Sequence, residues 1–167
     1  MKKDKLILLL LAVGLVLWIS GVVTKLFISS EMLAGKNFAF APPASLSSER
    51  ILYSLIAKST IMYILGFVLT LLFSILFIKE KKYILKKEGW LLISILILIV
   101  FLPVELFTIW IDLKFIQLEF SQNVDINELR KLFVHRVHAL VGAPYMALMG
   151  YSTIIIFTIF KPLKQIN

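Results

Sequence analysis

Residues 129–160 read LRKLFVHRVHALVGAPYMALMGYSTIIIFTIF, and this stretch holds both histidines of the chain. Its long apolar part predicts a helix over residues 132–160. Small residues recur every four positions after His135 and His138, a spacing that places them on one helix face. They are Ala139, Gly142, Ala143 and Ala147. Because small residues let membrane helices approach closely, we expect this face to pack and both histidines to point into a helix bundle.

The composition indicates a membrane protein. The chain has 167 residues, which fits a single domain over residues 1–167. Hydrophobic residues make up 60% of it, and its mean hydropathy is +0.95. A soluble domain could not bury so much apolar surface, so a lipid bilayer is the expected solvent. The absence of cysteine excludes disulfides, thiolate metal sites and a thiol nucleophile.

Three more apolar runs precede this stretch, so we expect an all-α, four-helix transmembrane bundle. The predicted helices span about residues 6–24, 51–78, 90–111 and 132–160, and the last two can extend beyond the outer membrane face. The first run is longer than a typical signal-peptide core of about 7–15 residues, so we expect it to stay as an anchor. The predicted connections are outer loops at 25–50 and 112–131 and a cytoplasmic loop at 79–89.

The distribution of lysine and arginine predicts the orientation. The first residues, the loop after residue 78 and the tail are basic, whereas the two longer loops carry balanced charge. Basic loops remain in the cytoplasm, so both termini are expected there. The predicted location is the bacterial cytoplasmic membrane.

Counting about 20 residues per span places several ionisable residues near the outer boundary. The candidate polar cluster is Lys58, Glu105, Asp112, His135, Arg136 and His138, and Lys25 ends the first run at the same level. In one interpretation these side chains reach interfacial water. In the other, Glu105 pairs inside the bundle with Lys58, Arg136 or His138, because a carboxylate between apolar neighbours needs a partner. A structural pair is the default.

The small-residue rows also predict where helices pack. A row on the second helix runs from Lys58 through Gly66. The full set of predicted packing residues is Gly66, Ala139, Gly142, Ala143 and Ala147.

The pattern of potential ligands favours no metal and no cofactor. A metal held by the two histidines would have only Glu105 and Asp112 as further ligands. Haem or quinone is the alternative, but a haem site would need both histidines from one helix face. Phosphate-binding loops, hydrolase motifs and the pattern of a nucleic-acid surface are missing from the sequence.

The second half of the chain resembles a group of small, uncharacterised four-helix bacterial membrane proteins. The resemblance rests on Pro103, Arg130, Phe133 and His138. It implies the four-helix arrangement and no particular chemistry.

Three functions follow as hypotheses. The favoured one is a non-enzymatic accessory or self-associating membrane component, with the bilayer and a second copy or a larger membrane complex as partners. The first alternative is a proton or small-solute transporter or channel subunit that uses Lys58, Glu105 and His138. The second alternative is a redox accessory protein that binds quinone or haem.

Overall fold

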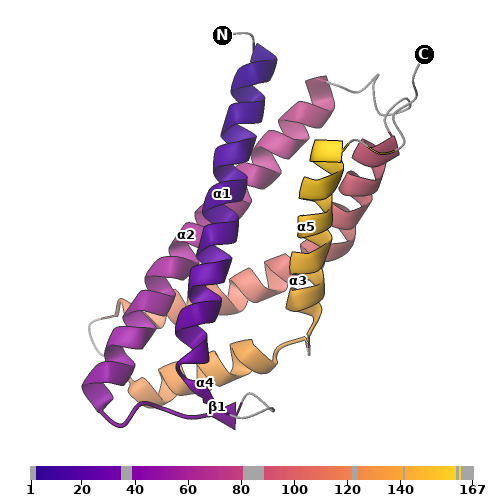
Figure 1. The fold of residues 1–167 in the computed structure, drawn as a ribbon. Helices are drawn as coiled ribbons and strands as arrows, with labels where there is room; N and C mark the ends of the chain where they lie inside the picture. Colours follow the sequence, from indigo (N-terminus) through magenta and orange to yellow (C-terminus); the bar gives the residue numbers. More distant parts are fainter. Residues whose placement is uncertain are drawn as a thin grey trace, which may run out of the picture.

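The computed structural model describes residues 3–34, 39–80, 89–121, 124–140, 142–160 and 162. Between α1 and α2, two short strands, β1 and β2, pair antiparallel with Leu33 opposite Phe40. Apart from these strands, the regular structure in the described ranges is helical (Figure 1). The elements are α1 (Lys3–Ser30), β1 (Leu33–Ala34), β2 (Ala39–Phe40), α2 (Leu46–Glu80), α3 (Gly89–Glu119), α4 (Ile126–His138) and α5 (Ala143–Phe160).

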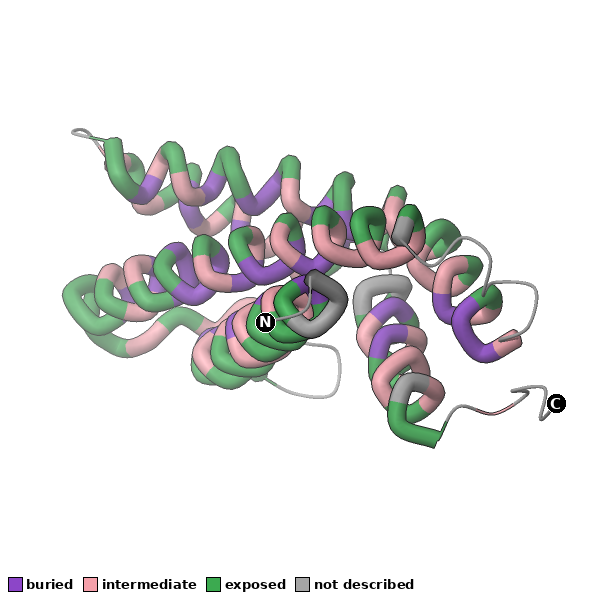
Figure 2. The backbone as a smooth tube through the Cα atoms, turned by 90° about the horizontal axis from the view of Figure 1, so that it is seen from above, coloured by how far each residue is buried: buried purple, intermediate pink, exposed green. Residues whose placement is uncertain are grey.

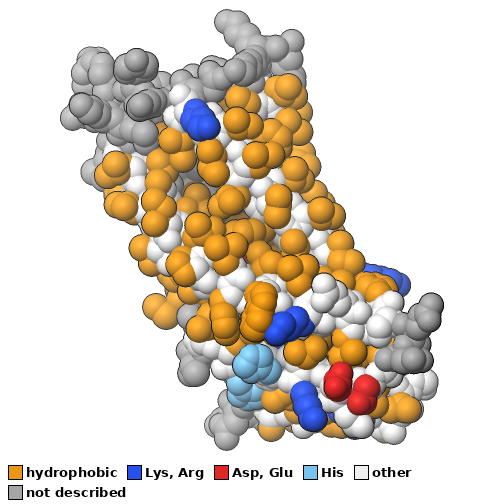
Figure 3. All heavy atoms as spheres, turned by 180° about the vertical axis from the view of Figure 1, so that it is seen from behind, with side chains coloured by type: hydrophobic (Ala, Val, Ile, Leu, Met, Phe, Trp, Pro, Cys, Tyr) orange, Lys and Arg blue, Asp and Glu red, His pale blue; other side chains and the backbone are white. Residues whose placement is uncertain are grey.

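Three helices are long and apolar enough to cross a membrane, in the stretches Leu6–Ser30, Leu46–Lys79 and Gly89–Glu119. A shorter apolar stretch, Tyr145–Phe157, lies in α5. Large apolar side chains on these helices face outward, which is the pattern expected of a surface in contact with lipid. Seen from behind, apolar side chains cover most of the molecule, and histidine and acidic side chains gather toward one end (Figure 3).

Helices α1 and α2 pack closely along their length because glycines lie at their contact. A Cβ atom at Gly21 would lie 2.5 Å from the backbone nitrogen of Tyr63, and one at Gly66 would overlap the backbone of Trp18. Any larger residue at either glycine would therefore push the two helices apart. Gly66 was among the predicted packing residues, and its contact is with α1.

Helix α3 is longer than the predicted 90–111 and continues to Glu119. It bends along its length, and its second half runs obliquely toward the first turns of α2 (Figure 1). Pro103 lies inside this helix. Proline lacks an amide hydrogen and its ring clashes with the preceding turn, which is a recognised cause of helix bending. The two halves of α3 therefore run in different directions, and the second half crosses the bundle toward the start of α2.

The fourth predicted helix is two helices in the structure, so the prediction of one continuous helix over 132–160 was wrong. Helix α4 ends at His138, and α5 begins at Ala143. Between them Leu140 and Gly142 adopt positive φ angles of 62° and 87°. The carbonyl of Gly142 then accepts the first helical hydrogen bonds of α5, from the amides of Tyr145 and Met146. Helix α4 crosses one end of the molecule, and α5 turns back along α3 (Figure 1).

The connections also differ from the prediction, because α1, α2 and α3 extend further than the apolar runs and α4 begins at Ile126. The outer loops expected at 25–50 and 112–131 shorten to the segments between Ser30 and Leu46 and between Glu119 and Ile126. Most of the predicted cytoplasmic loop, residues 81–88, lies outside the described residues.

Two apolar clusters hold the helices together. Buried residues face neighbouring helices and exposed residues lie outside (Figure 2). The first cluster joins the ends of α1, α2 and α3 to α4 and consists of Met32, Tyr53, Ile56, Ala57, Phe115, Leu129 and Phe133. The second joins the middle of α1 and α2 to α5 and consists of Trp18, Tyr63, Phe67, Ala147 and Tyr151.

Candidate functional site

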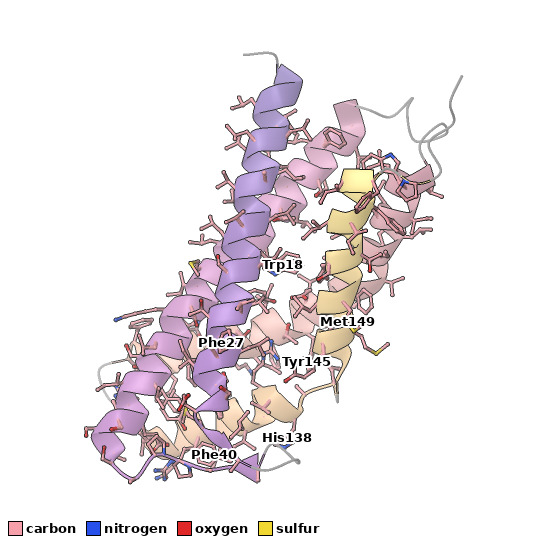
Figure 4. All side chains as sticks on the ribbon, viewed as in Figure 1. Trp18, Phe27, Phe40, His138, Tyr145 and Met149 are labelled. Carbon is pink, nitrogen blue, oxygen red and sulfur yellow. The ribbon has the colours of Figure 1, made fainter. Side chains whose placement is uncertain are left out.

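A cavity of about 260 Å³ lies between the two apolar clusters. All five helices contribute to its wall, which combines aromatic and charged side chains. Leu26 and Ser30 of α1 and Tyr145 of α5 line it and are exposed, so the cavity reaches the molecular surface between these two helices. Figure 4 shows Trp18 of α1 and Tyr145 of α5 pointing toward the space between α1 and α5. This cavity is the candidate functional site.

One wall of the cavity is an ion-paired cluster centred on Asp112. Lys25 Nζ lies 2.6 Å from Asp112 Oδ1, and Arg136 Nε lies 3.1 Å from the same oxygen. Asp112 thereby joins α1, α3 and α4 at one atom. Its side chain is only 3% exposed. A carboxylate buried this deeply requires compensating charge, and the two cations supply it.

A second carboxylate, Glu105, lines the cavity one and a half to two turns before Asp112 on α3. It is buried, and its Oε2 accepts a hydrogen bond from the hydroxyl of Tyr63 on α2. Thr108 donates its own hydroxyl to the backbone carbonyl of Glu105, at 2.9 Å. The carboxyl group therefore has an aromatic hydroxyl as its hydrogen-bond partner instead of a lysine.

Three buried polar atoms in the cavity wall have no hydrogen-bond partner within the described residues. They are Trp18 Nε1, Asp112 Oδ2 and the hydroxyl of Tyr151. The rings of Trp18 and Tyr151 touch edge to face, with centroids 4.3 Å apart. Buried polar groups are nearly always paired, so three unpaired ones in a single cavity call for an explanation.

A separate ion pair fixes α4 against α2 outside the cavity. Arg130 donates from Nε and Nη2 to the two carboxylate oxygens of Glu49, at 2.7 and 2.6 Å. The hydroxyl of Tyr53 donates to the same carboxylate at 3.0 Å. The hydrogen bonds to Glu49 raise the pKa of Arg130. This two-pronged geometry orients α4 across the end of the bundle.

The structure brings together only part of the predicted polar cluster. Glu105, Asp112 and Arg136 line the same cavity. Lys58, by contrast, is exposed on α2, which corrects the expectation that it pairs with Glu105.

The histidines also differ from the prediction. His135 and His138 are exposed on α4 and do not point into the bundle. His138 uses its Nδ1 in a contact of 2.9 Å with the carbonyl of Val134. Because α4 is a separate amphipathic helix, its apolar face holds Leu129 and Phe133 and its outer face holds the histidines.

The predicted packing residues between 139 and 147 do not all lie at helix contacts. Ala139 and Ala147 are buried, and Ala147 belongs to the second apolar cluster. Gly142 is not at a close contact, because a Cβ atom there would have no atom within 4 Å. Its role is conformational, at a positive φ in the break between α4 and α5. Ala143 begins α5, and its side chain lies outside the described part of the structure.

Sequence reasoning missed Trp18, Tyr63 and Tyr151, which complete the cavity. A signal was present, because each carries a polar atom in the middle of an apolar run and such atoms usually find a partner when buried. Counting residues along the first span places Lys25 at the level of the other charges but gives it no partner. Its partner Asp112 lies 87 residues away in the sequence, beyond the reach of helical spacing rules.

Within the described ranges, no three His, Asp or Glu side chains are grouped so that they could hold a metal ion. Comparisons of the chain with protein-family models, with curated proteins and with solved structures find no match.

Proposed function

We propose that the chain is an integral protein of the bacterial cytoplasmic membrane, embedded by α1, α2, α3 and α5 with both termini in the cytoplasm. Helix α5 has 18 residues. At 1.5 Å per residue it is about 27 Å long, close to the roughly 30 Å of a hydrocarbon core. Four helix termini lie at one end of the molecule (Figure 1). They are the starts of α1 and α3 and the ends of α2 and α5. The lysine-rich segment 79–87 joins α2 to α3 in the sequence, which favours the cytoplasm for that end.

We propose further that the protein is a non-enzymatic accessory component that binds a small molecule in the cavity. The observation that carries this proposal is the set of three unpaired buried polar atoms, Trp18 Nε1, Asp112 Oδ2 and the Tyr151 hydroxyl. A bound molecule that pairs with them would gain about 0.5–1.5 kcal/mol from each hydrogen bond. Pockets with a few convergent polar groups in an apolar wall are typical binding sites.

The small-residue rows do not support self-association of the protein, because their residues pack within one chain. Gly66 contacts α1, and Ala147 packs in the second apolar cluster, so both are used inside one chain. The accessory role therefore rests on the cavity, and an association with other membrane proteins would involve the outward-facing apolar surface.

The proposal can be tested by identifying what leaves the membrane with the protein. Leu148 lines the cavity, and a Leu148→Trp variant would fill part of it. Ile156→Trp, at an exposed position of the same helix, is the matched control. Parent and control should release the same small molecule on solvent extraction and mass spectrometry, and Leu148→Trp should not. The same extract from all three proteins would contradict the proposal.

Proton or small-solute movement is the second candidate, because Glu105 is a buried carboxyl group that lines the cavity and contacts a tyrosine hydroxyl. A flux assay in liposomes would compare the parent with Glu105→Gln. Loss of flux with retained folding would support transport. No flux from the parent would remove this candidate. A haem is not favoured, since both histidines are exposed on α4 and neither offers a buried axial ligand.

A further inference from the structure

The charges that line the cavity indicate what kind of head group it can hold. Lys25 and Arg136 are the basic groups in its wall, and Glu105 and Asp112 are the acidic ones. Asp112 is already paired with both cations through Oδ1. A charged ligand would bring one more ion into a largely buried site whose two cations are already paired, and an uncompensated charge is costly there. An uncharged ligand has no such cost.

The unpaired atoms set the hydrogen-bonding pattern of the ligand. The indole Nε1 of Trp18 can only donate, and Asp112 Oδ2, as part of a carboxylate, can only accept. The Tyr151 hydroxyl can do either. A ligand that satisfies all three must therefore both accept and donate, which ring-bound hydroxyl and carbonyl oxygens can do together.

The volume of the cavity and the aromatic side chains that line it favour a ligand that contains a ring. A cavity of about 150 Å³ holds benzene. The 260 Å³ available here suits a ring with several substituents and excludes a complete lipid. Aromatic side chains surround the space on several sides, where they can pack edge to face or offset against a ligand ring. They are Trp18, Tyr63, Phe115, Phe133, Tyr145 and Tyr151.

The surface around the opening favours an attached apolar tail. The opening lies between the end of α1 and the start of α5, where Leu26 and Tyr145 are exposed. Nearby on the same helices, Phe27 and Met149 are each 72% exposed and Met146 is 64% exposed. Figure 4 shows Phe27, Tyr145 and Met149 at this end of α1 and α5. A tail that left the cavity here would lie against apolar side chains.

We propose that the cavity binds an uncharged, lipid-soluble molecule whose head is a hydroxyl-bearing ring of the phenol or hydroquinone class. This inference rests on the proposed function, because it names the chemical class of the ligand for the same site. The ring would occupy the space beside Trp18 and Tyr151, where a ring oxygen can accept from Trp18 Nε1 and a ring hydroxyl can donate to Asp112 Oδ2.

The test uses three probes with the same decyl tail and different heads. They are 4-decylphenol, the anion undecanoate and the cation decyltrimethylammonium. Binding to the full-length protein in lipid nanodiscs is measured by calorimetry. The phenol should bind the parent protein and fail to bind Leu148→Trp. Tyr151→Phe, which removes one oxygen and no charge, should weaken phenol binding about tenfold, the effect of one lost hydrogen bond.

Trp18→Phe should weaken phenol binding by a similar factor, and the matched control Trp110→Phe, at an exposed position of α3, should not. If undecanoate or the ammonium probe binds more tightly than the phenol, and Leu148→Trp abolishes that binding, the cavity is a ligand site but the inferred class is wrong. If no probe shows binding that depends on Leu148, the inference is wrong, and the extraction of parent and Leu148→Trp decides the proposed function separately. Equal phenol binding by all variants indicates simple partition into lipid and overturns the inference.

Discussion

Asp112 holds two cations on a single oxygen, which makes it the most sensitive residue of the cavity wall. Asp112→Asn leaves the largely buried Lys25 and Arg136 without their shared carboxylate partner, so the free energy of unfolding in detergent should fall by about 3–5 kcal/mol. The double variant Asp112→Asn with Lys25→Met should recover part of this loss, because one of the two stranded charges is gone. A single variant as stable as the parent would mean that the ion pairs contribute nothing.

Glu105 gives a second prediction at this scale. Tyr63→Phe removes the hydroxyl that donates to the Glu105 carboxylate and leaves the cavity-lining ring in place. The loss of a partner from a buried polar group should lower the free energy of unfolding by about 1–3 kcal/mol. Tyr145→Phe, at an exposed position of α5, is the control and should change it by less than about 0.5 kcal/mol. Equal losses for the two variants would mean that the hydrogen bond to Glu105 contributes nothing.

At the residue scale, the sequence predicted which charged residues lie at the same level along the helices better than it predicted which of them are paired. Counting residues along the spans places Asp112 and Arg136 at one level, and the structure brings them within 3.1 Å of each other. The partner of Glu105 could not be predicted in this way. Whether Lys58 or Tyr63 faces α3 depends on the rotation of α2, which is set by its packing against Gly21 of α1.

At the scale of helices, two glycines have different roles, and substitution can distinguish them. Gly66 lies against the backbone of Trp18, so Gly66→Ala should destabilise the protein by about 1–3 kcal/mol through steric overlap, and Gly66→Asn by more. Gly142 has open space around it and a positive φ, so Gly142→Ala should cost roughly 1–2 kcal/mol in backbone strain.

For Gly142, the asparagine variant should be milder than the alanine variant, because asparagine tolerates positive φ. Thermal unfolding in detergent of all four variants measures these effects. If asparagine is worse than alanine at both positions, Gly142 would be at a close contact after all.

The break between α4 and α5 was missed because the local signal for it lies within a continuously apolar segment. The break between α4 and α5 coincides with Gly142-Ala143-Pro144, a glycine followed by a proline in the first turn of a helix. The apolar character continues through this segment, so a hydropathy pattern gives one helix where the backbone forms two. The extension of α3 to Glu119 agrees with the expectation that the third helix can continue past residue 111.

At the scale of the whole molecule, the orientation gives a direct prediction. The chain has no cysteine, so single cysteines can be placed without background. Ser45→Cys, at an exposed position before α2, should react with an impermeant thiol reagent added to intact cells. Lys79→Cys, exposed at the other end of α2, should react only after the membrane is permeabilised. The reverse pattern would invert the proposed topology.

The arrangement of the helices was only partly predictable. Composition and periodicity indicate long apolar helices, because the bilayer imposes their length. They do not indicate that α1 lies along α2 while α5 lies along α3, nor that a cavity remains between α1 and α5. Those features depend on side chains far apart in sequence, such as Trp18 and Tyr151, whose rings meet across the gap.

The shared oxygen of Asp112 also has a consequence for the order of synthesis. Lys25 is made 87 residues before its partner, and Arg136 follows 24 residues after Asp112. A nascent chain that contains only α1 and α2 therefore carries Lys25 with neither group in existence. The three-helix junction can be completed only once α4 has emerged, so a chain truncated before residue 136 lacks the contact that ties α4 to Asp112.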